Sequence, residues 1–223
     1  MARIATISSI RNLIMPDLPP WLPLFPLHAV LFPNGILPLK IFEARYIDMV
    51  SACMKQTTPF GVALIREGQE IGAAAVPEAV GCLAHIVQWD MHSDGLLTLR
   101  TEGGRRFRIL EQRLSGQLLE ARVELLAAEL PHPLPIRLQA CATTLQLVID
   151  DIESKGGATD ADASPYCSPF ARPLQLSDAG WVANRWCEVL PIPLKARQKL
   201  LELDDAVSRL AIVDQYLRQH HIL

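Results

Sequence analysis

The chain has 223 residues, half of them hydrophobic (50%), which is enough to bury the core of one large or two small globular domains. Its formal net charge of −3 leaves no overall positive field and argues against general attraction to nucleic acid or to an anionic membrane. The cysteines are widely separated and form no C-x-x-C pair, so we expect buried reduced thiols and no zinc or redox site. They are Cys53, Cys82, Cys141, Cys167 and Cys187.

Residues 1–19 are predicted to form a loosely ordered leader. Their apolar stretch is broken by Asn12, Pro16 and Asp17 before the core of a signal peptide can form. We therefore expect a cytoplasmic protein.

Prolines interrupt the apolar run that follows, from residue 22 to residue 54. A membrane-spanning helix needs about 20 nearly continuous apolar residues, so this run is expected to fold into short strands instead. The prolines should occupy strand ends, edges or turns, and Asn34-Gly35 should form a tight reversal. They are Pro23, Pro26, Pro33 and Pro38.

After Phe42 the apolar residues change to helical spacing, with Tyr46, Met49 or Val50, and Cys53 on one face. From residue 60 to residue 126 the pattern alternates as in strands. Turn residues at 93–95, 103–104 and 115–116 (Ser-Asp-Gly, Gly-Gly and Ser-Gly) should join four strands into an antiparallel meander. Regular spacing of this kind suits a curled sheet or a small barrel.

Beyond Pro131 the sequence predicts helices, separated by a long loop at 156–176. Ser177 is a candidate N-cap, Pro191 should end that helix, and Asp204 or Asp205 should cap the last one. We therefore expect an α+β fold, with a β-rich unit at 20–130 and a helical bundle at 131–223.

The opening run carries a resemblance to a known family. Residues 22–49 resemble the start of the Lon protease N-terminal (LON substrate-binding) domain, with its L-P-L-F-P-L, V-L-F-P and L-P-L-x-I-F-E-x-R-Y-x-x-M segments. Ala44 stands where the family commonly has proline, and alanine also fits a first helical turn. Residues 80–109 are similar to the family's V-G-x-x-A-x-I, D-G and G-x-x-R-F-x-I segments.

The resemblance implies a PUA-like pseudo-barrel with one helix, followed by a helical bundle, in a free-standing bacterial form of the domain. It also implies a role in holding unfolded or tagged polypeptide, with a protease or another copy of the chain as further partners. The sequence has no G-x-x-x-x-G-K-[ST] loop, no H-E-x-x-H and no G-x-S-x-G. We therefore expect a non-enzymatic binding module without a cofactor, with a role as an adaptor.

Apolar side chains outside the expected core are the candidates for peptide contact. Met and aromatic residues suit recognition of many sequences, because they adapt to different partners. A strand edge or groove can supply backbone pairing without any sequence motif. The candidates are Trp89 and Met91 near a hairpin tip, and Tyr166 and Phe170 in the long loop.

RNA binding is the first alternative, because PUA-like barrels often bind RNA and Arg105, Arg106 and Arg108 surround an aromatic residue. The competing interpretation is a turn followed by an edge strand with outward arginines, and the family's own G-x-x-R-F pattern favours it.

An enzyme with a cleft between the two halves is the second alternative. His85 and Cys167 are its candidate groups, although His85 is expected to be a hydrogen-bonded core histidine. The basic residues 195, 197 and 199 are expected on a solvated helix face, and the histidines at 220 and 221 are expected to form no designed metal site.

Overall fold

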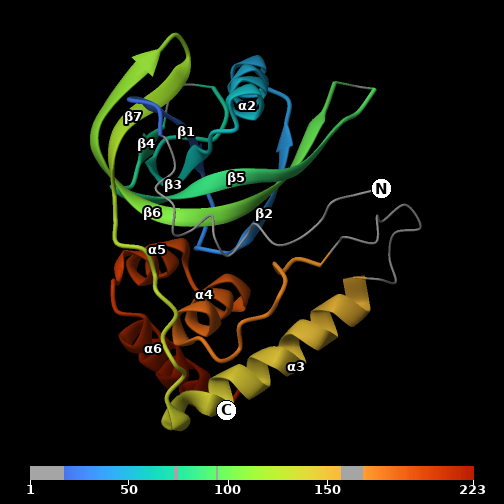
Figure 1. The fold of residues 1–223 in the computed structure, drawn as a ribbon, viewed down its shortest axis with the longest axis vertical. Helices are drawn as coiled ribbons and strands as arrows, with labels where there is room; N and C mark the ends of the chain where they lie inside the picture. The colour runs from blue at the N-terminus through green and yellow to red at the C-terminus, as the bar shows by residue number, and fades with distance from the viewer. Residues whose placement is uncertain (1–17, 73–74, 94, 157–167) are drawn as a thin grey trace.

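A computed structural model describes residues 18–72, 75–93, 95–156 and 168–223, and Figure 1 shows a β-rich half stacked on a helical half. The predicted α+β class, with its helical C-terminal part, is confirmed. The strands are β1 (Leu22–Leu27), β2 (Ile36–Ile41), β3 (Phe60–Glu67), β4 (Val76–Pro77), β5 (Val80–Met91), β6 (Leu97–Ser115) and β7 (Leu118–Leu125). The helices are α2 (Ala44–Gln56), η1 (Ile136–Leu138), α3 (Gln139–Gly156), α4 (Ala179–Val189), α5 (Leu194–Glu202) and α6 (Ala206–Gln219).

The strands close into a barrel. Hydrogen-bonded neighbours follow the order β1-β7-β6-β5-β3, and β1 also pairs in parallel with β3, which completes the ring. β1 pairs with β7 at Leu22 and Pro23 and with β3 from Leu24 to Leu27, so each part of β1 has one side without a described strand partner. Such a side tolerates the missing N–H of a proline.

β2 and α2 cover the apolar face of the barrel. Asn34 has a φ of 59° and forms the predicted reversal that leads into β2, which holds Pro38 and pairs with β6. The predicted helix after Phe42 is confirmed, and its buried residues are the expected ones. Among them Tyr46 packs on Phe25, with ring centroids 4.1 Å apart.

The predicted turn at Gly103-Gly104 is wrong, because both glycines lie inside the 19-residue strand β6. A Cβ on Gly103 would lie 2.0 Å from the carbonyl oxygen of Phe32, so glycine is needed for close approach of two backbones and not for a reversal. Asn34 N donates to Gly103 O at 2.7 Å, and Gly103 N donates to Gly35 O at 2.8 Å. The meander therefore has three strands, β5, β6 and β7.

The helical half has its own apolar core, built mainly by α3, α4, α5 and α6. Its caps follow the expected chemistry with one shift: Asp178, not Ser177, caps α4 by accepting from Gly180 N at 3.0 Å. Asp205 caps α6 through Ser208 N, as predicted. Pro193 precedes α5, and α3 ends at the edge of the predicted long loop.

Residues 126–135 connect β7 to η1 and contain the predicted domain boundary near residue 130. Phe32 and Val80 of the β-rich half are nevertheless part of the core cluster of the helical half. The division of the chain into two separate domains therefore remains a prediction, because the two halves share apolar contacts.

Candidate peptide-binding surface

β5 has an open edge. β3 pairs with β5 only opposite Cys82–Ala84, whereas β5 continues to Met91 alongside β6. Residues 86–91 therefore have β6 on one side and no described strand on the other, and Figure 1 shows this hairpin projecting from the barrel. An edge of this kind presents unpaired backbone N–H and C=O groups to which an extended chain can add.

Two rows of apolar side chains run from the buried core to this edge. Trp89 lies opposite Leu99 of β6, which lies opposite Leu39 of β2. In the next row Met91 lies opposite Leu97. The β2 and β6 residues of these rows are buried, whereas Trp89 is 55% and Met91 47% exposed. Each row therefore ends in an exposed side chain on β5, at the edge where a further strand would cover it.

Val87 extends the apolar surface at a register shift between Ile86 and Gln88. Polar side chains also lie near the tip: His92 Nε2 lies 4.0 Å from Asp90 Oδ2 and 3.2 Å from Thr98 Oγ1. We call Val87, Trp89, Met91 and the backbone of 86–91 the β5 edge. It combines an apolar centre with a polar rim, which is the usual arrangement of a protein-binding surface.

The structure does not place the four predicted peptide-contact residues together. Phe170 is only 5% exposed, forms a bridge with Gly35 and belongs to the core of the helical half, so its assignment to a binding surface is corrected. Tyr166 and Cys167 lie outside the described residues. Trp89 and Met91 remain as the candidate pair.

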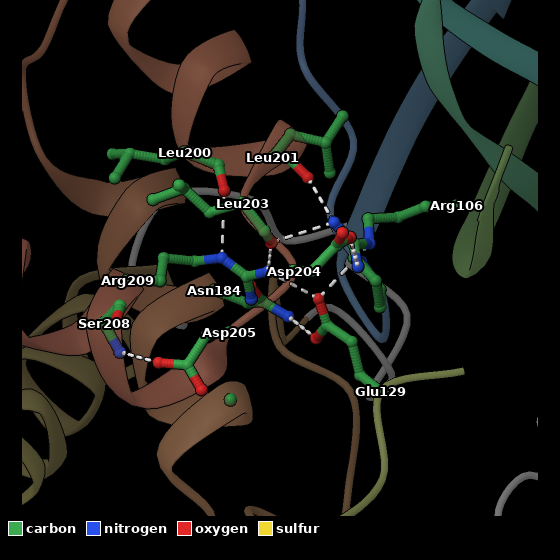
Figure 2. Close-up of polar contacts among 12 residues, drawn as sticks. Arg106, Glu129, Asn184, Leu200, Leu201, Leu203, Asp204, Asp205, Ser208 and Arg209 are labelled. Carbon is green, nitrogen blue, oxygen red and sulfur yellow. Dashed lines mark hydrogen bonds and ion pairs between the residues drawn. The ribbon is translucent and has the colours of Figure 1, made fainter. Parts of the chain in front are cut away.

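Arg106 does not point outward. It is 2% exposed, and its guanidinium donates to Leu201 O at 2.7 Å, to Leu203 O at 2.9 Å and to Asp204 Oδ1 at 3.0 Å (Figure 2). These acceptors lie in and after α5, so Arg106 ties β6 to the helical half. The outward-arginine interpretation is wrong for this residue.

Glu129 joins a second arginine to this contact. Its Oε1 accepts from Arg209 Nη2 at 2.8 Å and lies 3.5 Å from Arg106 Nε, while its Oε2 accepts from Asn184 Nδ2 at 2.9 Å (Figure 2). Arg209 Nη1 in turn donates to Asn184 Oδ1 at 2.8 Å. Two buried cations are thereby held by two carboxylates, those of Glu129 and Asp204, and by several carbonyls, which compensates for the loss of water. Sequence reasoning missed Glu129, Asn184 and Arg209.

A separate contact joins the Pro33–Gly35 turn to α4. The buried Arg185 donates to Pro33 O at 3.0 Å, to Asn34 O and to Glu188 Oε1 at 2.7 Å. Burial raises the pKa of Glu188 to about 7, and the neighbouring Arg185 opposes that rise. The two halves are thus joined by buried polar contacts on both sides of β6 as well as by shared apolar packing.

Of the two groups considered for catalysis, His85 and Cys167, the structure describes only His85. No cluster of three or more His, Cys, Asp or Glu side chains able to hold a metal occurs in the part of the chain that the structure describes. His85 is half-buried, with its ring over Gly104.

Two basic residues of α5 and one C-terminal histidine also have partners. Arg197 donates to Leu190 O at 2.8 Å, Lys199 Nζ lies 2.7 Å from Glu202 Oε2, and the His220 ring stacks on Tyr216.

The cysteines that the structure describes should be chemically inert in the folded protein. All four are buried, and burial raises the pKa of Cys187 to about 12. Burial and the Asp214 carboxylate raise the pKa of Cys141 to about 12, and burial raises that of Cys82 still further. Because the thiolate is the nucleophile, we expect no alkylation of these residues by iodoacetamide even at about pH 9.

Mass spectrometry of tryptic peptides checks this expectation. All four described cysteines should become alkylated once the protein is unfolded in guanidinium chloride, which serves as the positive control. Rapid modification of Cys82, Cys141 or Cys187 in native protein would contradict the burial that raises their pKa values.

A closed barrel joined to a helical unit, with an open apolar edge and no metal cluster among its described residues, has the features of a recognition domain. Comparison with known families agrees: residues 21–219 match the family described as the ATP-dependent protease La (LON) substrate-binding domain. The chain belongs to this family. No described helix has the length and apolar character that crossing a membrane requires.

Known relatives cover nearly the whole chain. It is 26% identical over 211 residues to a Lon protease of Anaeromyxobacter dehalogenans and 25% identical over 210 residues to Lon protease 2 of Myxococcus xanthus. Each match covers 93% of this chain but 24% of the relative, so the chain spans about a quarter of the length of these proteases.

Solved structures share the fold. A Lon N-terminal domain protein from Xanthomonas campestris is 31% identical, with a TM-score of 0.68 over 88% of this chain and 98% of that one. The N-terminal domain of the Mycobacterium avium complex Lon protease has a TM-score of 0.57 over 90% of this chain and 99% of that one. At 14% identity the second likeness concerns the fold alone.

Proposed function

We propose that the chain is a non-enzymatic recognition module that binds unfolded polypeptide segments carrying exposed apolar side chains. The observation that supports this most directly is the β5 edge, where two apolar rows leave the core and end beside unpaired backbone. Membership of a substrate-binding family supports the same class of ligand. The β5 edge is the surface that we assign to the contact.

Strand addition explains how one surface accepts many sequences. Backbone hydrogen bonds along 86–91 would supply affinity that does not depend on the side chains of the bound segment. Alternate side chains of that segment would pack on Trp89 and Met91, whose flat and flexible side chains accommodate different shapes. A folded protein hides both its backbone and its apolar residues, so the module selects unfolded segments.

Replacing both Trp89 and Met91 by alanine should weaken binding of fluorescein-labelled apolar peptides by about tenfold or more, because aromatic anchors dominate such contacts. Fluorescence anisotropy over a panel of extended peptides measures the change. Leu147→Ala is the matched control, since Leu147 is 65% exposed on α3 and outside the β5 edge.

Peptides methylated on alternate backbone nitrogens test strand addition itself. They keep their side chains but lose donors, so they should bind less well than the unmodified peptides. Equal affinity of the double variant and the parent protein would refute the β5 edge as the site. Failure of the parent protein to bind any peptide of the panel would refute the proposed function.

Within this proposal the module works in the cytoplasm as an adaptor that holds polypeptide for a protease. RNA binding has little support by comparison, because Arg106 is buried in ion pairs and Arg105 donates to Leu126 O at 2.7 Å. Of the three arginines considered, Arg108 alone is exposed.

A further inference from the structure

Figure 1 shows α5 and α6 at the side of the helical half. An apolar depression of about 510 Å³ lies between these two helices. Aliphatic side chains and one tyrosine form most of its walls. Ile212 is 48% exposed within it, although it lies in the middle of a helix. We call this depression the α5–α6 groove. Its main lining residues are Ala196, Leu200, Leu203, Ile212, Val213 and Tyr216.

The backbone of the groove is already hydrogen-bonded. Leu190 O accepts from Arg197, Leu200 O accepts from Arg209 Nε at 2.9 Å, and Leu203 O accepts from Arg106 Nη1 at 2.9 Å. An extended peptide lying here would bury its own N–H and C=O groups against apolar side chains that cannot form hydrogen bonds with them. This burial would make the free energy of binding considerably less favourable. A helix satisfies its own backbone and loses nothing in this way.

The charges beside the groove favour an occupant that carries acidic residues on one flank. Lys195 is exposed on α5, and Lys199 one turn later is paired with Glu202 at 2.7 Å. The exposed α6 positions at this level, Gln215 and Gln219, are uncharged. Lys195 lies one helical turn before the lining residue Lys199 and makes no ion pair with the described residues, so acidic residues on the flank of a bound helix would complement it.

Within the part of the chain that the structure describes, the outward faces of α2 and α3 in a second copy do not match the groove. The exposed face of α3 carries a single large apolar residue, Leu147, among polar neighbours such as Asp150 and Ser154. The outward positions of α2 include Asp48 and Lys55. Among the described helices none presents an exposed apolar stripe other than the groove itself. The outward faces of α2 and α3 therefore do not supply the occupant, and we assign the groove to a helix of a different polypeptide.

We infer that the α5–α6 groove docks an amphipathic helix of another protein, with the helix's apolar stripe on Leu200, Ile212 and Val213 and its acidic flank beside Lys195. This inference goes beyond the proposed function, because it concerns a folded helical segment and uses no residue of the β5 edge. The module thereby has separate surfaces for an unfolded segment and for a helical partner.

Synthetic peptides of about 15 residues, long enough to form a helix on binding, test the inference. One carries leucine at positions i, i+4, i+7 and i+11 with glutamate on one flank; the second has lysine in place of glutamate; the third is a scrambled version of the first. Fluorescence anisotropy should show the highest affinity for the acidic peptide, a lower affinity for the basic peptide and the lowest for the scrambled peptide. Circular dichroism should show helix formation when the acidic peptide binds.

Ala196→Trp should fill the groove and weaken binding of the acidic helix by about tenfold. Ile212→Asp provides a second, independent variant at an exposed position, and Lys195→Glu should reverse the preference between acidic and basic peptides. Trp89→Ala with Met91→Ala should leave helix binding unchanged, and Ala196→Trp should leave binding of extended peptides unchanged. Equal binding of the scrambled peptide, binding without helix formation, or full affinity of both groove variants would overturn the inference.

Discussion

Replacing Arg209 by alanine is expected to lower the free energy of unfolding by about 3–5 kcal/mol, the range measured when one partner of a buried ion pair is removed. The guanidinium of Arg209 is fully buried and contacts Glu129, Asn184 and two carbonyls of the α5 region. Its removal leaves Glu129 with less compensation and takes one donor from each of the two carbonyls, although Leu203 O keeps its hydrogen bond from Arg106. The contact between α6 and the segment that enters the helical half is lost at the same time.

Urea unfolding followed by tryptophan fluorescence measures this change. Arg122→Ala is the matched control, because the Arg122–Glu111 pair at 3.3 Å is exposed and should contribute little to stability. Adding Glu129→Gln to Arg209→Ala should recover part of the loss, since the carboxylate that has lost its closest cation is then neutral. A stability of Arg209→Ala equal to that of the control would show that the buried network does not hold the two halves together.

Gly103→Ala should destabilise the protein by about 3 kcal/mol, at the upper end of the usual range for overpacking. The added methyl group would lie 2.0 Å from the Phe32 carbonyl oxygen. This neighbour is backbone, held by the reciprocal hydrogen bonds between Gly103 and the Asn34-Gly35 turn. Neither partner can move without breaking that contact, and Phe32 would have to leave the core of the helical half.

Gly104→Ala provides the comparison one residue along the same strand. Its added methyl group would meet the ring of His85, with Nε2 at 2.6 Å, and a side chain can rotate away more easily than backbone can move. The loss in the free energy of unfolding should therefore be smaller than for Gly103→Ala. Equal losses for the two variants would show that general crowding in β6 matters more than the contact with Phe32.

The sequence was most informative where structure depends on neighbours along the chain. The helix after Phe42 follows from apolar spacing, and Asp205 follows from capping chemistry, because both are local effects. The reversal at Asn34-Gly35 was predicted for the same reason. The change from alternating to helical spacing near Pro131 indicated the order of the two halves, and the family resemblance then implied a PUA-like pseudo-barrel for the first.

The predictions were wrong where contacts between residues far apart in the sequence determine the local structure or the burial. Gly103-Gly104 has the composition of a turn, but its conformation depends on the backbone of Phe32, about 70 residues earlier. Arg106 alternates with the buried Phe107 and was therefore expected in solvent, yet the helical half covers that face of β6 as well. Phe170 was predicted at the surface because its loop composition does not indicate that it packs against Gly35.

The pairing of β1 with β7, a strand that follows much later in the chain, has a consequence for biosynthesis. β1 is the first strand of the barrel, but its partners are β3 and β7, and β7 ends at Leu125. During translation β1 must therefore remain without its second partner until β7 has left the ribosome. Closure of non-local pairs is slow and exposes apolar edges meanwhile, so in its nascent form this chain itself resembles the unfolded polypeptides that we propose it binds.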